Sequence, residues 1–213
     1  MCSSDLGWFD FDRDGWLDMF VANGGVATIE ALARAKDPFP LRMTPQLYRN
    51  AGGGHFDDVS SRAGAVFRIA DVGRGVAFGD IDNDGDTDIL VANDHGPLRL
   101  LINNVVNQNH WAGFRLVGRA FQARRPGDPE RVAPRDQLGA RVQIIREGQP
   151  PLWRRARSDG SYASANDPRV LVGLGAFKAP VRVKVTWPSG RVESFFNMPV
   201  DHYTTLTEGT GAP

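Results

Sequence analysis

The sequence lacks the features that mark several common classes of protein. It has one cysteine, Cys2, which excludes both a disulfide scaffold and a zinc site built from several cysteines. No apolar run approaches the about 20 residues that a membrane-spanning helix needs, so we expect no membrane insertion. Basic and acidic residues are equal in number, 25 of each, and no DNA- or RNA-reading motif is present. We therefore expect no nucleic-acid partner.

The first residues also lack a signal peptide. Residues 1–7 contain neither its basic segment nor its apolar segment. A patterned segment is already under way at Trp8, so we interpret the chain as a fragment of a larger protein. On this interpretation the signal peptide was lost with the missing amino-terminal part.

Turn-forming residues are abundant, with 24 glycines and 14 prolines among 213 residues. This composition favours many short strands over long helices. The zero net charge conceals a division, because residues 1–109 hold 9 basic and 16 acidic side chains and residues 110–213 hold the reverse. The two parts of the chain therefore have different surfaces, and we expect two domains, 1–108 and 109–213.

The clearest pattern is a repeat at an offset of 70 residues. Residues 8–23 are WFDFDRDGWLDMFVAN, and residues 78–93 are FGDIDNDGDTDILVAN. Both contain the spacing D-x-D-x-D-G-x-x-D, followed by an apolar run that ends in Ala-Asn. The repeat indicates two copies of one structural unit.

The spacing of the aspartates predicts two calcium sites. Carboxylates at loop positions 1, 3 and 5 face the inside of one turn, and glycine at position 6 permits the bend. Each close pair of carboxylates would repel by about 4 kcal/mol at about 4 Å if no cation were present. Ca²⁺ suits such a large, flexible set of oxygen ligands better than Mg²⁺ does. The predicted ligands are Asp10, Asp12, Asp14, Trp16 and Asp18 in the first loop and Asp80, Asp82, Asp84, Asp86 and Asp88 in the second.

Position 7 of each loop, Trp16 or Asp86, would contribute its backbone carbonyl. The alternative is a solvated turn that holds no ion. An EF-hand is excluded, because it needs glutamate at position 12 and flanking helices. That position is Val21 or Val91, each in a β-branched run. We therefore expect the loops to join strands, with Phe11 and Ile81 pointing inward.

The rest of the acidic part also predicts strands. Residues 46–50 and 55–59 flank Ala-Gly-Gly-Gly and indicate a hairpin, and further strands are expected at 73–78 and 98–104. The only helical pattern covers residues 26–35. Four strands for each repeat are typical of a propeller blade.

These motifs resemble a known family. Residues 78–93, the run Leu-Tyr-Arg-Asn at 47–50 and the run Gly-His-Phe-Asp-Asp-Val at 54–59 resemble the FG-GAP/VCBS repeat of integrin-alpha-like β-propellers. The resemblance implies Ca²⁺ in the loops and a role as an extracellular interaction scaffold. A closed propeller takes about four to eight blades, and this chain supplies about two.

The basic part predicts a β-sandwich. Strand candidates cover residues 111–117, 140–146, 152–157, 170–174, 181–187, 191–196 and 203–206. Residues 182–187 alternate polar and apolar side chains, and Pro188-Ser189-Gly190 forms a turn after them. About seven short strands of this kind favour two packed sheets. The arginine-rich stretch at 121–135 is expected to be a loop.

This part resembles the ASPIC/UnbV domain of cartilage-acidic-protein-like proteins, which follows VCBS repeats. The motifs occur in the expected order: Asn-His-Trp at 109–111, Leu-Gly-Ala-Arg-Val at 138–142, Ser-Asp-Gly-Ser-Tyr at 158–162, Gly-Leu-Gly at 173–175 and Trp-Pro-Ser-Gly at 187–190. The sequence thus predicts an all-β protein, a partial β-propeller followed by a β-sandwich-like domain.

The predicted function is that of a calcium-binding, non-enzymatic interaction or adhesion module, secreted or at the cell surface. We expect no enzyme activity, because no serine lies in a G-x-S-x-G elbow and the four histidines show no H-E-x-x-H pairing. The expected partner is a protein or a polysaccharide. Two alternatives stay open: a carbohydrate-binding accessory region that uses Trp153 and Arg155, and a hydrolase or lyase that acts on a calcium-bound substrate.

Overall fold

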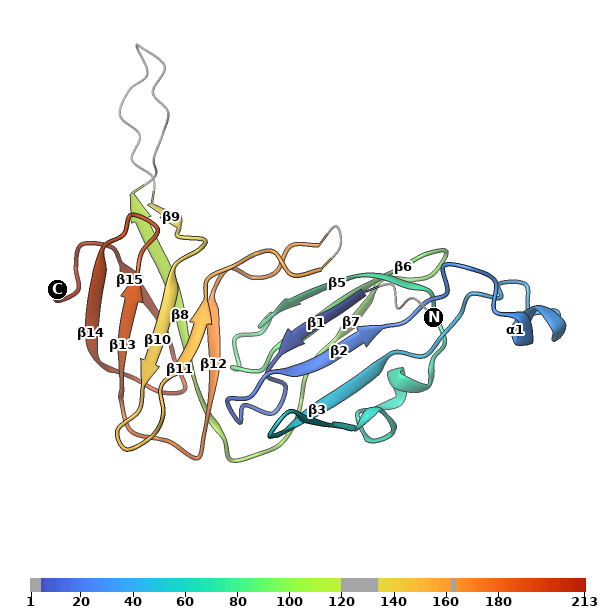
Figure 1. Cartoon of the computed structure of the whole chain (residues 1–213), viewed down its shortest axis with the longest axis horizontal. Coiled ribbons are helices and arrows are strands. Elements are labelled where there is room, and N and C mark those ends of the chain that lie inside the picture. Colours follow the sequence, from blue (N-terminus) through green and yellow to red (C-terminus); the bar gives the residue numbers. More distant parts are fainter. Residues whose placement is uncertain (1–4, 120–133, 162–163) are drawn as a thin grey trace, which may run out of the picture. The chain divides into compact units, whose positions relative to one another are not determined.

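The computed structural model describes residues 5–119, 134–161 and 164–213, and it is nearly all β, as the sequence predicts (Figure 1). Cys2 and most of the arginine-rich stretch at 121–135 lie outside the described residues. The chain divides into two compact units, Met1–Asn107 with Asp159–Asp167, and Gln108–Ser158 with Pro168–Pro213. We describe each unit by itself.

The first unit contains two antiparallel sheets. One has the order β1-β2-β3-β4, with β1 (Asp5–Phe9), β2 (Asp18–Ala22), β3 (Gln46–Gly52) and β4 (His55–Asp58). The other has the order β5-β6-β7, with β5 (Gly73–Gly79), β6 (Asp88–Asn93) and β7 (Arg99–Leu101). Neighbours in sequence are neighbours in each sheet, which is the meander topology of a propeller blade.

The two sheets contribute to one apolar core. Phe20 and Val76 are fully buried there, and the rings of Phe9 and Phe78 lie 5.2 Å apart between centroids. The short 3₁₀ helix η2 (Ala65–Arg68) adds Phe67, whose ring lies edge-on to that of Phe20. A second 3₁₀ turn, η1 (Ser60–Arg62), precedes it.

Three details differ from the sequence prediction. The second sheet has three strands, and among the described residues no fourth strand pairs with β7. The helix α1 covers only Glu30–Arg34 rather than residues 26–35, because prolines follow it closely and no side chain caps it. Ile81 is 56% exposed and not inward-facing, whereas Phe11 packs against the core. Phe11 and Ile81 hold the same loop position and make the same backbone hydrogen bond, so the surroundings of each loop, and not the loop geometry, determine whether this side chain is buried.

Residues 159–167 belong to the first unit although they lie far along the chain. The backbone N–H of Phe78 on β5 donates to Asn166 Oδ1 at 2.9 Å, and the N–H of Asp167 donates to the carbonyl of Phe78 at 2.9 Å. The segment therefore covers the edge of β5 that β6 leaves open.

The second unit is a two-sheet sandwich. One sheet has the order β11-β10-β13-β14, with β10 (Arg141–Ile145), β11 (Leu152–Arg155), β13 (Val181–Thr186) and β14 (Val192–Met198). The other has the order β12-β8-β15, with β8 (His110–Arg119), β12 (Val170–Gly175) and β15 (Tyr203–Thr207); β9 (Pro134–Asp136) pairs with β8. Both sheets contribute buried side chains to a single core, as a sandwich requires.

Alternation along β13 places its residues as the sequence predicts. Val181, Val183 and Val185 are almost fully buried, whereas Arg182 and Lys184 are exposed. The turn after this strand is closed by the N–H of Gly190, which donates to the carbonyl of Trp187 at 2.9 Å.

Candidate metal centre

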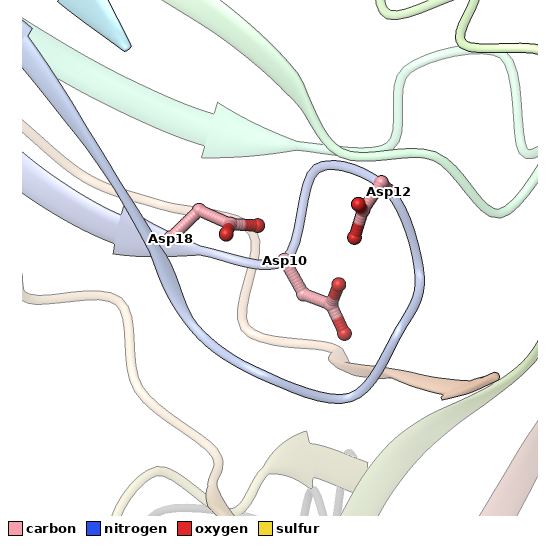
Figure 2. A group of neighbouring side chains, drawn as sticks. All are labelled: Asp10, Asp12 and Asp18. Atoms are coloured by element: carbon pink, nitrogen blue, oxygen red, sulfur yellow. The ribbon is translucent and has the colours of Figure 1, made fainter. Parts of the chain in front are cut away.

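The loop between β1 and β2 brings three carboxylates together. Oxygen atoms of Asp10, Asp12 and Asp18 lie within 4.8 Å of one another. Figure 2 shows the three side chains pointing toward one another from this loop. Asp18 is completely buried and Asp10 nearly so, and thus the group is largely shielded from solvent.

Backbone N–H groups hold the buried carboxylates in place. Asp10 accepts from Asp14 at 3.1 Å through Oδ1 and from Gly15 at 2.9 Å through Oδ2. Asp18 accepts from Phe11 at 2.9 Å and from Asn50, on β3, at 2.8 Å. These bonds fix the loop so that its carboxylates converge on one point.

The loop between β5 and β6 repeats this arrangement bond for bond. Asp80, Asp82 and Asp88 converge within 4.8 Å. The set of donors matches that of the first loop: Asp84 and Gly85 to Asp80 at 3.1 and 2.9 Å, and Ile81 and Asn103 to Asp88 at 2.9 and 2.8 Å. The repeat seen in the sequence is therefore a repeat of geometry as well.

The backbone conformation at position 6 requires glycine in both loops. Gly15 and Gly85 adopt φ values of 92° and 89°, in the left-handed region that a side chain strongly disfavours. The residue at position 4, which is Arg13 or Asn83, also has a left-handed backbone conformation. Two left-handed residues in six allow the chain to turn tightly enough to face its carboxylates inward.

Burial raises the pKa of four aspartates in the two loops. For Asp18, burial raises the pKa to about 7, although hydrogen bonds from two backbone N–H groups lower it. Burial also raises the pKa of Asp86 to about 6, with Arg13 partly offsetting the rise. The pKa values of Asp14 and Asp88 are raised for the same main reason. A bound divalent cation would reverse these shifts, because it favours the ionised form of its ligands.

Arg49 and Arg13 each form ion pairs with aspartates of the loops, but with residues at different loop positions. Arg49 of β3 forms ion pairs with Asp12 at 2.7 Å and with Asp14 at 3.0 Å. Arg13, from the first loop, lies 3.1 Å from Asp86 of the second. Asp12 belongs to a converging group, whereas Asp86 does not.

The structure groups some of the predicted ligands and leaves others aside. The residues at positions 1, 3 and 9 converge in both loops. At position 5, Asp14 and Asp84 each accept a hydrogen bond from the backbone N–H two residues later, at 2.9 Å. At position 7, the Trp16 side chain is 56% exposed. The complete ligand set of ten residues stays a prediction.

Sequence reasoning missed Asn50 and Asn103, which bind Asp18 and Asp88 through their backbone N–H groups. It also missed the ion pairs of Arg49. The signal that could have found the asparagines is a second repeat, L-x-x-N, at residues 47–50 and 100–103. An insertion that contains α1 changes the spacing between loop and asparagine, and this hides the match at a constant offset.

The donor set suits calcium. All converging atoms are carboxylate oxygens, the ligands preferred by hard cations, and the described residues place no cysteine or histidine in either group. The residues present therefore fit Ca²⁺, which would link the loop carboxylates and relieve their mutual repulsion.

Comparison with known proteins agrees with both parts of this architecture. Residues 10–91 match the family model of the FG-GAP-like repeat, and residues 131–213 match that of ASPIC and UnbV. The chain is similar to Cartilage acidic protein 1 of Xenopus tropicalis, with 41% identity over 71 residues, which is 33% of this chain. The matched segment covers 10% of that relative. Among the described residues, no helix has the length and apolar character needed to cross a membrane.

Proposed function

Because the chain belongs to the FG-GAP repeat proteins that carry a C-terminal ASPIC/UnbV domain, we propose that it is a calcium-binding, non-enzymatic interaction module of the adhesion type. Its place of action is outside the cell or at the cell surface. Its ions are held by the two loops that follow β1 and β5, and each ion joins a strand end to its neighbour.

One observation carries this proposal: two loops, distant in sequence, hold three converging carboxylates each with the same hydrogen bonds. The carboxylates of Asp18 and Asp88 are buried, and burying a carboxylate costs free energy when no cation is bound. A solvated turn without an ion would leave them exposed. Extracellular Ca²⁺ is abundant enough to occupy sites of modest affinity.

The experiment is a thermal melt of the chain in millimolar Ca²⁺, in Mg²⁺ and in chelator. At free Ca²⁺ of about 100 times the dissociation constant, one site adds about 2.7 kcal/mol to the free energy of unfolding. Asp82→Asn removes an exposed member of the second group without emptying a buried position, so it should reduce the shift specific to Ca²⁺. Asp57→Asn, exposed on β4, is the matched control.

A melting temperature that is the same in Ca²⁺ and in chelator would contradict the proposal. So would an equal loss of the shift in Asp82→Asn and Asp57→Asn. A response to Mg²⁺ as large as that to Ca²⁺ would reject the choice of metal.

A second candidate function is the binding of an acidic polysaccharide, and one face of the second unit favours it. Trp153 and Arg155 are exposed on β11, and the strand register places Arg141 and Lys184 on the same face. The four strands of this sheet carry one carboxylate, that of Glu193, and it is buried. An exposed indole beside several cations suits a sugar ring that bears sulfate or carboxylate groups.

This candidate is tested with the full chain on a glycan panel that contains neutral and acidic polysaccharides. Trp153→Ala and Arg155→Ala should each weaken binding to the acidic members. Trp8→Ala, at a half-exposed tryptophan of the first unit, is the control. The absence of binding across the panel removes the candidate and leaves the calcium proposal untouched.

A further inference from the structure

We propose that Arg49 acts as a resident cation of the first loop and makes that loop a weaker Ca²⁺ site than the second. The inference rests on the proposed calcium function and concerns how the two sites differ. Its evidence is a difference between two otherwise equivalent loops.

The guanidinium of Arg49 contacts two carboxylates of the first loop. Its Nε donates to Asp12 Oδ2 at 2.7 Å and its Nη2 to Asp14 Oδ2 at 3.0 Å. Both are charge-assisted bonds, which are roughly twice as strong as neutral ones. The two aspartate side chains are only 13% and 19% exposed, and water therefore screens the pairs incompletely.

The second loop has no arginine at the corresponding place. Met19 pairs with Tyr48 in the first sheet, and its counterpart Ile89 pairs with Leu101 in the second. Tyr48 therefore corresponds to Leu101, and the next residues, Arg49 and Ile102, correspond to each other. The next residue confirms this register, because Asn50 and Asn103 donate to Asp18 and Asp88 at the same distance of 2.8 Å.

Arg13 does not supply the same charge to the second loop. It pairs with Asp86 at position 7, outside the converging group of Asp80, Asp82 and Asp88. Asp82 and Asp84, the counterparts of Asp12 and Asp14, form no ion pair with an arginine among the described residues. In the first loop, by contrast, Asp12 of the converging group is one of the partners of Arg49.

A cation that enters the first loop must share Asp12 with the guanidinium or displace it. Both routes cost free energy that the second loop does not require. The same ion pairs hold the first loop in shape when no metal is present. The first loop therefore binds Ca²⁺ more weakly but keeps its conformation without the ion. The conformation of the second loop depends more strongly on bound Ca²⁺.

The sequence offers a probe that distinguishes the sites. Trp16 lies within the first loop, and its counterpart in the second is Asp86. Tryptophan sensitises the luminescence of nearby Tb³⁺, so bound Tb³⁺ should report the first loop, and Trp16→Phe should remove the signal. Displacement of Tb³⁺ by Ca²⁺ then measures the calcium affinity of this loop.

Arg49→Gln should tighten Ca²⁺ binding to the first loop by about tenfold, because the competing charge is gone. Arg99→Gln is the matched control, since Arg99 pairs with Asp71 and contacts neither group of carboxylates. The reciprocal variant Ile102→Arg should weaken the second site, measured by calorimetric titration with Ca²⁺. Ile102 is 47% exposed, and an arginine there should not disturb the core.

Unchanged or weaker binding in Arg49→Gln, with a wild-type melting temperature in Ca²⁺, overturns the inference. If Arg49→Gln fails to fold, an undiminished second site in Ile102→Arg overturns it equally. Either result leaves the calcium function standing. The absence of calcium binding in the wild-type chain and in every variant contradicts the proposed function itself.

Discussion

Arg13 of the first aspartate loop lies 3.1 Å from Asp86 of the second, and this ion pair links the two loops directly. Asn107 holds Arg13 on the first loop: its side-chain amide donates to the carbonyl of Asp12 and accepts from Arg13. Asn103 provides a second link between the loops, because its side chain donates to the carbonyl of Phe11 and its backbone N–H donates to Asp88. The two loops therefore belong to one network of hydrogen bonds and ion pairs, and a substitution in one loop should change the stability of the other.

The Arg13–Asp86 pair should be measurable by a double-mutant cycle. We expect Arg13→Gln and Asp86→Asn to be coupled by roughly 1–2 kcal/mol in the free energy of unfolding, measured in chelator. The side chains are only 15% and 5% exposed, so the coupling energy should exceed that of a surface salt bridge. Strictly additive effects of the two substitutions would show that the contact contributes nothing.

The stability of the metal-free protein should fall as the pH rises. Asp18 has a pKa of about 7 in the folded state, above its ordinary value of 3.8. Between about pH 4 and pH 7 the folded chain therefore keeps a proton at Asp18 that the unfolded chain has lost. The free energy of unfolding then decreases with pH, by up to about 1.4 kcal/mol per unit from this group.

Asp18→Asn isolates this contribution. The amide does not titrate, and in chelator the variant should therefore show a flatter dependence of stability on pH than the wild type. In excess Ca²⁺ the wild-type decrease should disappear, because a bound cation stabilises the ionised carboxylate. Urea titrations at several pH values measure both effects. Parallel curves for the wild type and Asp18→Asn in chelator would contradict the assigned pKa.

The sequence predicts most of this fold because its patterns are local. Alternation along residues 182–187 indicated a half-buried strand, and the aspartate spacing indicated a loop between strands; both features depend on neighbours in the chain. The convergence of Asp10, Asp12 and Asp18 follows from the same short spacing.

What the sequence did not indicate depends on contacts between distant residues. Arg49 reaches the first loop from β3, and no local pattern distinguishes it from any other exposed strand arginine. Ile81 was expected inside because it is apolar, but it is 56% exposed, whereas Phe11 at the same position of the first loop packs against the core. The loop pattern is the same in both, so the difference comes from the elements around each loop. Residues 159–167 join the first unit through bonds to β5, which no spacing in the chain could indicate.

The contact of residues 159–167 with β5 yields a further prediction. The side chain of Asn166 accepts a hydrogen bond from the backbone N–H of Phe78 at 2.9 Å, in the position that a neighbouring strand would take. Asn166→Ala removes this acceptor, and the amide of Phe78 should exchange its hydrogen faster, with a loss of about 1 kcal/mol in the free energy of unfolding. Hydrogen exchange followed by mass spectrometry of peptides from β5 measures the change. Ala165→Ser, at an exposed position of the same segment, is the control for a general effect of substitution. If Phe78 exchanges at the wild-type rate in Asn166→Ala, the segment does not protect the edge of β5, and the edge is then available to pair with another strand.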